Sequence, residues 1–547
     1  MKDPFPRPAL AMSVVLPAIL LQLIPARAHE STLAAFLKRH NVAALARPVG
    51  IGALSGHEVC RLKVTLTEEG TGAELPGLIR VTPECSEEAL QLPGLCHRAR
   101  GWHTMPASAD LEVPRTKLRI EALHGLETEK AERSLDLSGR DRAEIRLPLR
   151  RIYDPRARGL KSGNTHLHLT RITFRDAQRY LREVPLGDGL DLLFVSYLRR
   201  MPDEARYTTN GFTRADLDRL SGGGIDFGWG QEHRHNFGRG EQGYGHVMLL
   251  NLLKLIRPVS IGPGIMGSGN DGRPLQTGIR EARTDGGTVI WCHNAFGHED
   301  LPNWMAGLVD AQNIFDGGSR GHYSETFYRY LNLGLKAPFS TGTDWFIYDF
   351  ARVYVPLEGP VTEREWLEVL SQGRSYITNG PFLELEAGGR QPGGTVSVSG
   401  KETVRIRGRG VGRLDFKALE LIVNGRVVHS VSSRPSEGHF VADLDFPLQV
   451  SEPGWVALRV PPNLPENELA RSLFAHTSPI YLQLDGRSIF RPEVAREVLA
   501  EMEESVAEIG SRASFSSSRE RESVLRVYRE GIRILSRRLA DLGKVTH

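Results

Sequence analysis

Histidine and carboxylate side chains follow several predicted strands in the middle third of this chain. The first group is Thr165-His166-Leu167-His168. Residues two apart on a strand project to the same face, about 6 to 7 Å apart, so the two imidazoles can converge on one metal ion. By itself a His-x-His pair is a weak signal, because most such pairs bind nothing.

Four more strand ends carry side chains of the same kind. Glu232 follows the apolar stretch 224–229, His246 opens another apolar stretch, and His293 and Asp344 each end one. Any one of them could be a hydrogen-bonded polar residue at the end of a strand. Five such positions in one region, all imidazole or carboxylate, favour a shared metal site over chance.

The segment 161–385 alternates short apolar strands with helical stretches. We expect strands at 164–169, 190–196, 224–229 and 288–292, and helices at 176–183, 214–220 and 275–284. This alternation predicts an α/β domain with a largely parallel sheet or barrel. In such folds ligands gather at the carboxyl ends of the strands, where these polar side chains lie.

The flanking segments have different patterns, which predict a multidomain α/β plus β protein. Segment 42–152 has short alternating runs broken by Gly and Pro, and it predicts a β-sandwich domain. Segment 386–490 predicts a second sandwich, with Asn424-Gly425 as a two-residue hairpin turn. Segment 491–547 has helical periodicity with a break at 514–518, so we expect two amphipathic helices there.

The N-terminus has the order of a secretory signal peptide. Lys2 and Arg7 precede an apolar run at 9–24, and Ala26-Arg27-Ala28 follows as a small-x-small cleavage site. The alternative is an uncleaved anchor, but the run is shorter than the ~20 residues that span a bilayer. We therefore expect segment 1–28 to be removed and the protein to be periplasmic or secreted, with no membrane span in the mature chain.

Composition excludes some partners and leaves the cysteines open. A formal net charge of +3 on 547 residues gives no support for a nucleic-acid partner. Cys85 and Cys96 are close enough in sequence to be paired, and Cys60 is either free or a competing partner. Cys292 is interpreted as buried core rather than a nucleophile, although a thiol there could bind metal.

The stretch Gly163-Asn164-Thr165-His166-Leu167-His168 resembles the opening motif of the polymerase-and-histidinol-phosphatase (PHP) metallohydrolases. The continuation is similar to the CehA/McbA-like branch, which includes carbamate-ester (carbaryl) hydrolases. Segment 366–381, with Gly373-Arg374-Ser375-Tyr376 in it, resembles the end of that branch's catalytic domain. The resemblance covers about 161–389 and implies a distorted seven-stranded (β/α) barrel.

The resemblance also implies two metal ions and their ligands. One ion would be held by His166, His168, Glu232 and Asp344, and the second by Glu232, His246 and His293, with Glu232 bridging the two. Members with three metals carry further ligands where this chain has 170–174, Tyr197 and Phe346. All three losses concern the third ion, so the resemblance implies a two-metal centre.

The ligand set suits Zn, Mn or Fe and does not choose among them. A hydroxide held by the two ions would attack the substrate, because metal binding lowers the pKa of water from 15.7 to about 7. Asp344 and Glu232 are therefore the candidate catalytic residues, and Asp344 could receive the proton.

Four neighbouring residues are candidates for substrate contact, each with a structural alternative. Arg234 suits an anionic group, or equally a structural ion pair. His235 could face the substrate, but hydrogen bonding behind the ligands is favoured. Tyr197 could donate to the substrate, and Trp345 could wall the pocket or pack in the core.

The sequence therefore predicts an exported binuclear metal-dependent hydrolase. Its substrate would be a small-molecule ester, either a phosphoester or a carboxyl or carbamate ester. The alternative is a metal-binding pseudoenzyme without turnover, whose β domains bind glycans or surface proteins.

Overall fold

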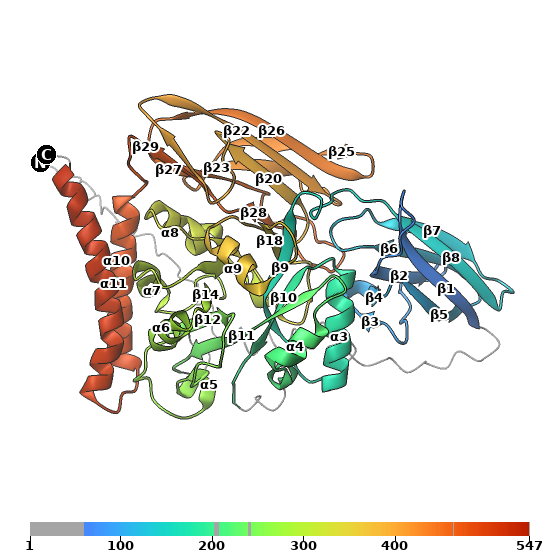
Figure 1. Ribbon diagram of the computed structural model, residues 1–547, viewed down its shortest axis with the longest axis horizontal. Helices are drawn as coiled ribbons and strands as arrows, with labels where there is room; N and C mark the ends of the chain where they lie inside the picture. The colour runs from blue at the N-terminus through green and yellow to red at the C-terminus, as the bar shows by residue number, and fades with distance from the viewer. Residues whose placement is uncertain (1–58, 202–206, 239–241, 463, 546–547) are drawn as a thin grey trace, which may run out of the picture.

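The computed structural model describes residues 59–201, 207–238, 242–462 and 464–545, with side chains as far as Leu542. The expected signal peptide and the start of the expected N-terminal domain lie outside these residues. The described chain is mixed α/β, with many strands in several sheets and few helices. Figure 1 shows the N-terminal sheets at one end and the helices α10 and α11 at the other. The strands of residues 382–484 lie along one side.

The N-terminal part consists of two sheets that share one apolar core. The first contains β1 (Val59–Glu68), β5 (Ser108–Pro114) and β8 (Arg142–Leu149). The second contains β2 (Gly77–Pro83), β3 (Cys96–His97), β4 (His103–Met105), β6 (Lys117–Leu123) and β7 (Ala131–Asp136). Alternate residues of β1 point inward, and Leu62 and Val64 meet Val81 and Ile120 of the second sheet in one cluster.

The middle part has a sheet whose pairings return to their first strand. Strand β9 (Leu160–His168) pairs in parallel with β10 (Leu192–Tyr197), which pairs in parallel with β11 (Asp226–His235). After β12 (Gly245–Leu250), parallel pairing continues through β14 (Thr288–Trp291), β15 (Ala311–Asn313) and β16 (Phe339–Ser340). After three intervening residues, β17 (Asp344–Trp345) pairs in parallel with β9.

The sheet departs from the expected parallel pattern at more than one strand. Strand β12 is antiparallel to both β11 and β14. The connection from β11 to β12, residues 236–244, is too short for the crossover of about a dozen residues that parallel neighbours need. Strand β12 therefore pairs with β11 in the antiparallel direction. The short β13 (Ser260–Ile261) then adds to β11 in parallel.

The expected helices of the middle part are confirmed. They are α3 (Phe174–Gly187), α4 (Arg214–Leu220) and α6 (Gln276–Thr284). Thr173 and Thr213 cap α3 and α4 by accepting hydrogen bonds from the backbone N–H three residues on. Helix α9 (Glu363–Ser371) follows β18 (Arg352–Pro356), which pairs antiparallel with β9.

A further β part follows β19 (Tyr376–Thr378). One sheet contains β20 (Phe382–Ala387), β22 (Glu402–Gly412), β26 (His439–Val450) and β25 (Arg434–Ser436). The facing strands are β21 (Thr395–Val398), β23 (Ala418–Val423), β24 (Arg426–Ser432), β27 (Gly454–Arg459), β28 (Ala475–Thr477) and β29 (Ile480–Leu484). Asn424 and Gly425 have φ of 51° and 91°, as the expected hairpin turn requires.

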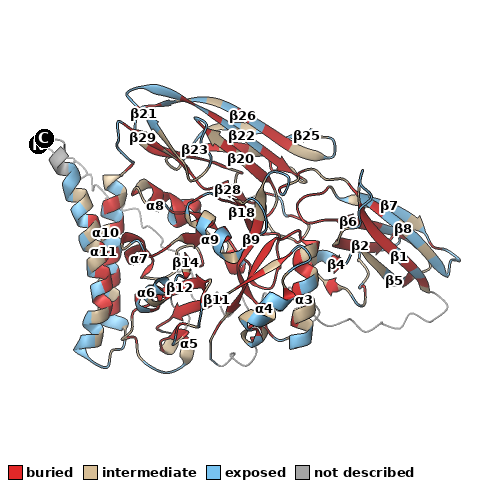
Figure 2. Cartoon of the chain, in the orientation of Figure 1, coloured by how far each residue is buried: buried red, intermediate tan, exposed pale blue. Residues whose placement is uncertain are grey.

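The tail forms the two expected helices, α10 (Pro492–Arg512) and α11 (Ser518–Val545). Their apolar faces point toward the middle part (Figure 2) and share its core, which also contains α7 (Asp300–Met305). A Cβ at Gly531 of α11 would lie 3.1 Å from Pro302 Cα of α7, so α11 and α7 are in contact there. No helix in the described part of the chain is both long and apolar enough to cross a membrane.

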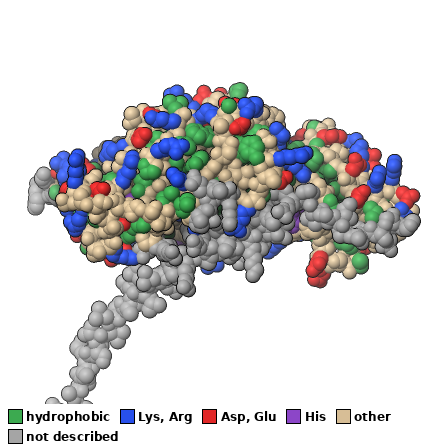
Figure 3. Space-filling model, turned by 90° about the horizontal axis from the view of Figure 1, so that it is seen from below, with side chains coloured by type: hydrophobic (Ala, Val, Ile, Leu, Met, Phe, Trp, Pro, Cys, Tyr) green, Lys and Arg blue, Asp and Glu red, His purple; other side chains and the backbone are tan. Residues whose placement is uncertain are grey.

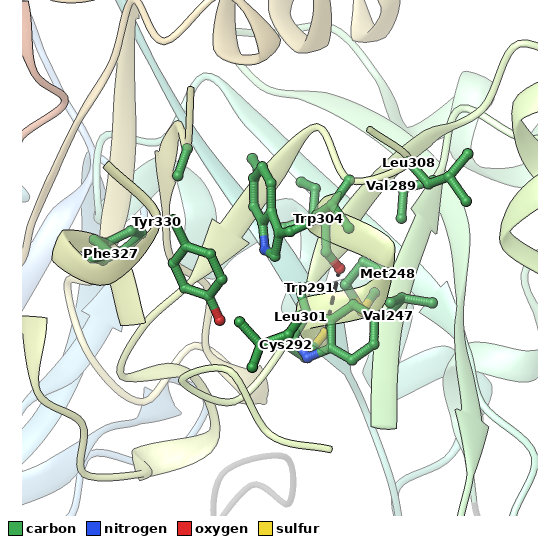
Figure 4. Packing of buried hydrophobic residues seen from close by; sticks show 14 of the residues in the cluster. Val247, Met248, Val289, Trp291, Cys292, Leu301, Trp304, Leu308, Phe327 and Tyr330 are labelled. Atoms are coloured by element: carbon green, nitrogen blue, oxygen red, sulfur yellow. Dashed lines mark hydrogen bonds between the residues drawn. The ribbon is translucent and has the colours of Figure 1, made fainter. Parts of the chain in front are cut away.

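The cysteines are unpaired in the described residues, so the disulfide considered between Cys85 and Cys96 is absent. Cys85 is exposed, whereas Cys96 is buried and donates to Glu183 Oε2 at 3.3 Å. Burial raises the pKa of Cys96 to about 12. Cys292 is buried in the apolar cluster with Trp291 and Leu301 (Figure 4), in agreement with its interpretation as core.

The surface carries charges of both signs. On the part of the face in Figure 3 that belongs to described residues, Lys and Arg side chains occur together with Asp and Glu side chains. This mixture agrees with the small formal net charge of +3.

Candidate metal centre

The six side chains expected to bind metal lie together at one end of the middle sheet. They form two groups of possible ligand atoms, and within each group the atoms lie within 4.8 Å of one another. The first is His166, His168, Glu232 and Asp344, and the second is Glu232, His246 and His293. All six are at most 5% exposed. Glu232 belongs to both groups.

Strand alternation positions the first two histidines. His166 and His168 project from the same face of β9, while Leu167 between them is buried in the apolar core on the opposite face. Each ring is then held by its Nδ1 atom. His166 Nδ1 lies 3.0 Å from Asp316 Oδ2, and His168 Nδ1 lies 3.0 Å from the Ser196 carbonyl oxygen. These partners are acceptors, so Nδ1 carries the proton in both rings and Nε2 keeps its lone pair.

The lone pairs of the first group converge on one point. His166 Nε2 and His168 Nε2 are 3.1 Å apart, and His168 Nε2 is 3.1 Å from Glu232 Oε2. Asp344 Oδ1 lies 3.3 Å from His166 Nε2 and 3.8 Å from His168 Nε2. Bond lengths near 2.0–2.1 Å around a tetrahedral ion place its ligand atoms about 3.3–3.5 Å apart. Four acceptors at this spacing fit a cation.

The second group is built on the other oxygen of Glu232. Glu232 Oε1 lies 3.6 Å from His246 Nδ1 and 3.5 Å from His293 Nε2. Asn236 Oδ1, 3.0 Å from His246 Nε2, supports the tautomer that leaves Nδ1 open for a ligand. Arg234 Nε lies 3.2 Å from the same Nε2 and donates there in the competing tautomer.

Buried oxygens of the carboxylates support the same conclusion. Within the described residues, Glu232 Oε1 and both carboxylate oxygens of Asp344 accept no hydrogen bond. A buried acceptor without a donor costs about 1–3 kcal/mol, and more when it is charged. A bound cation would satisfy all three oxygens. The donor set therefore fits two divalent ions bridged by Glu232.

Two ligands depend on backbone in the left-handed region. His293 has φ of 55° and Asp344 has φ of 59°, values that are uncommon for residues other than glycine. Gly342 is required close by, because a Cβ there would lie 2.6 Å from His166 Cβ. Such local strain persists where surrounding structure enforces it and often occurs at functional sites.

The site perturbs its own ionisable groups. Burial opposes the charge of Glu232, but Arg234 and the neighbouring histidines outweigh it and hold its pKa well below the usual range. Burial also opposes protonation of His293, yet Asp316 and Glu232 raise its pKa to about 9. For Asp344, burial and the Glu232 charge raise the pKa against the attraction of the histidines.

The four expected substrate-contact residues have different positions. Arg234 is 3% exposed, and its Nε lies 3.5 Å from Glu232 Oε1, so it belongs to the centre. The Trp345 ring lies 5.5 Å from the His168 ring and walls the centre. His235 turns away, with Nε2 3.2 Å from Asp271 Oδ1, and is not at the centre. Tyr197 is half-buried at the end of β10.

Sequence reasoning missed Asp316. Its Oδ2 faces His166, and its Oδ1 accepts from the His293 backbone N–H at 3.0 Å and lies 3.3 Å from His293 Nδ1. The available signal was the one used for the other ligands, because Asp316 follows β15 by three residues. Asp316 also forms a third close group with His166 and the Cys292 thiol, whose pKa burial raises to about 12.

Comparison with known proteins gives no relative for this arrangement. No family model, curated protein or solved structure matches the chain.

Proposed function

We propose that the chain is a binuclear metal-dependent hydrolase of the PHP type, similar to the CehA/McbA-like branch. The observation that carries the proposal is the convergence of His166, His168 and Asp344 on one oxygen of Glu232, and of His246 and His293 on the other. In this proposal residues 161–385 form a distorted (β/α)7 barrel, flanked by β-sandwich domains at 42–152 and 386–490. The pairing path that returns from β17 to β9 supports it.

The proposed chemistry is hydrolysis of an ester. When bound, two divalent cations (Zn, Mn or Fe) lower the pKa of water from 15.7 to about 7 and polarise the oxygen of the electrophile. Glu232 would hold both ions, one with each carboxylate oxygen. Asp344, which accepts no hydrogen bond from the described residues, would take the proton of the attacking water.

Two neighbours would orient the substrate and exclude water. The Arg234 guanidinium is buried beside Glu232, where it would hold a negatively charged oxygen of the substrate. Trp345 stacks on Tyr207, with ring centroids 5.8 Å apart, and the pair would shield the centre from solvent beside His168. We further propose that the mature protein acts outside the cytoplasm, after removal of segment 1–28.

The test is turnover by the purified, metal-loaded chain. We expect hydrolysis of one class among nitrophenyl phosphomonoesters, phosphodiesters, carboxyl esters and carbamates. His166→Ala should reduce kcat by at least about a hundredfold, because it removes a ligand of the centre. His322→Ala is the matched control, since His322 is exposed, and it should keep wild-type kcat.

Two results would contradict the proposal. Turnover that survives His166→Ala unchanged would place the chemistry elsewhere. Binding of two ions per chain without turnover of any class would favour a metal-binding pseudoenzyme whose β domains bind glycans or surface proteins.

A further inference from the structure

A cavity of about 440 Å³ lies at the other end of β9 from the metal centre. Leu160 and Pro356 line it where β9 begins, whereas His166 and His168 stand near the end of the strand. The path from Leu160 to His168 is roughly 26 Å at about 3.3 Å per residue. The cavity is therefore distinct from the metal centre. Its volume is within the range of roughly 300–1,000 Å³ that small-ligand sites have.

The floor of the cavity is apolar and aromatic. Tyr153, Tyr354 and Tyr376 are each at most 5% exposed, and the rings of Tyr354 and Tyr376 stack at 5.1 Å. Leu383 and Leu385 of β20 extend the apolar lining. The Tyr376 hydroxyl is buried and forms no hydrogen bond within the described residues. The floor suits the apolar or ring part of a ligand.

The rim of the cavity is rich in guanidinium groups. It contains Arg158, Arg374, Arg407, Arg409, Glu384 and Glu386. Three of the arginines have carboxylate partners: Arg158 pairs with Glu384 at 2.7 Å, Arg407 with Glu386 at 3.5 Å, and Arg409 with Asp443 at 3.4 Å.

Arg374 differs from the other arginines of the rim. It is exposed, and no described carboxylate lies within 4.0 Å of it. It thus leaves one positive charge uncompensated at the edge of an apolar cavity. Arg374 and Tyr376 belong to segment 366–381, which the sequence analysis singled out, and the metal centre uses neither of them.

We propose that this cavity binds a small organic anion. A guanidinium presents a planar fork of N–H donors that matches a carboxylate, phosphate or sulfate group, so the anionic group would contact Arg374. The body of the ligand would cover the tyrosine floor. The ion pairs Arg158–Glu384 and Arg407–Glu386 at the rim offer donors and acceptors for its other polar groups. An inorganic anion would leave the floor uncovered and bind more weakly.

The test is calorimetric titration of the metal-loaded full chain with three organic anions, which are glucuronate, glucose 6-phosphate and 4-hydroxybenzoate. Glucose is the neutral counterpart of the first two, and methyl 4-hydroxybenzoate is that of the third. Inorganic phosphate is the control for an anion without an organic part. At least one organic anion should bind with Kd below about 1 mM, and about tenfold more tightly than its neutral counterpart and than phosphate. Comparing the carboxylates with the phosphate ester identifies the preferred anionic group.

Three variants locate the binding. Arg374→Ala should weaken it by about tenfold or more. Arg390→Ala should leave it unchanged, because Arg390 is exposed and does not line the cavity. His166→Ala should also keep it, since the metal centre is at the far end of β9. The proposal is overturned if no organic anion binds at about 10 mM. It is equally overturned by wild-type affinity in Arg374→Ala or by loss of binding in His166→Ala.

Discussion

Asp316 Oδ2 lies 3.0 Å from His166 Nδ1, whereas the Nε2 atom of the same ring is directed at the metal centre. The other oxygen of the same carboxylate accepts from the His293 backbone N–H at 3.0 Å. His166 belongs to one group of ligand atoms and His293 to the other. One buried carboxylate therefore orients a histidine of each group.

Replacing Asp316 should weaken both metal sites. In Asp316→Asn the negative charge is lost, and either amide orientation sacrifices one of the two contacts. We expect the affinity for divalent ions to fall by about 10–100-fold, as for other groups that orient metal-binding histidines. Competition with a chromophoric chelator measures it, and Asp218→Asn on the exposed side of α4 is the control. Wild-type affinity in Asp316→Asn would show that the contact to His166 has no role in metal binding.

The cysteines should all be titratable as thiols. Cys60, Cys85, Cys96 and Cys292 are free, and only Cys85 is exposed. A thiol reagent should therefore modify one cysteine in the folded chain, at Cys85. In denaturant without reductant it should modify all four. Loss of two thiols in denaturant, restored by a reductant, would mean that a disulfide forms after all.

Acid should destabilise the fold through neutral buried histidines. Burial lowers the pKa of His103 and His476 to about 3, from an ordinary value near 6.5. His476 Nε2 accepts from the Tyr328 hydroxyl at 2.7 Å and Nδ1 donates to the Thr477 carbonyl oxygen at 2.8 Å, which requires the neutral ring. The unfolded chain binds these protons first. Stability is thus fully present above about pH 6.5 and falls as the pH drops toward 3.

Each histidine contributes a slope of up to about 1.4 kcal/mol per pH unit in that window. Urea unfolding between pH 7 and pH 5 measures it, above the range in which most carboxylates titrate. His476→Gln should reduce the slope by the contribution of one histidine, up to about 1.4 kcal/mol per pH unit. His322→Gln, at an exposed position, should keep the wild-type slope. An identical slope in His476→Gln would exclude a neutral His476 as the cause.

The helical tail should be an integral part of the fold. Leu525 of α11 is 1% exposed and lies in the core cluster that the tail shares with the middle part. Leu525→Ala should lower the free energy of unfolding by about 2–5 kcal/mol, because it leaves a cavity. Leu253→Ala, at a position 79% exposed, should change it by less than about 0.5 kcal/mol. Equal effects of the two substitutions in urea unfolding would mean that α11 does not pack there.

Local patterns were sufficient to predict several elements of the fold, including the strand that carries His166 and His168. Period-two alternation placed His166 and His168 on one face of a strand, and their rings do meet. The break at 514–518 separated the two tail helices, and Asn424-Gly425 marked a hairpin. In each case the deciding interaction is between residues near in sequence, so the sequence pattern contains it.

Interactions between distant segments could not be predicted in this way. Asp316 contacts His166 across 150 positions, and periodicity has no information on that pairing. The direction of His235 depends on Asp271, whose carboxylate also accepts from the Ser514 backbone N–H of the tail. The orientation of the His235 side chain therefore depends on three segments that are far apart in the sequence. The antiparallel β12 is an intermediate case, because the short connection before it favours an antiparallel neighbour, whereas the alternation of strands and helices predicted a parallel one.

The most direct test of the metal centre is the number of divalent ions per chain in variants of single ligands. Elemental analysis of the purified wild-type chain should give two ions. His168→Ala should remove the ion of its own group, and His246→Ala the ion of the other, so each should retain about one. Glu232→Gln should lose both, since its two oxygens serve both groups. A wild-type chain that binds no divalent ion, or a Glu232→Gln chain that keeps two, would contradict the account.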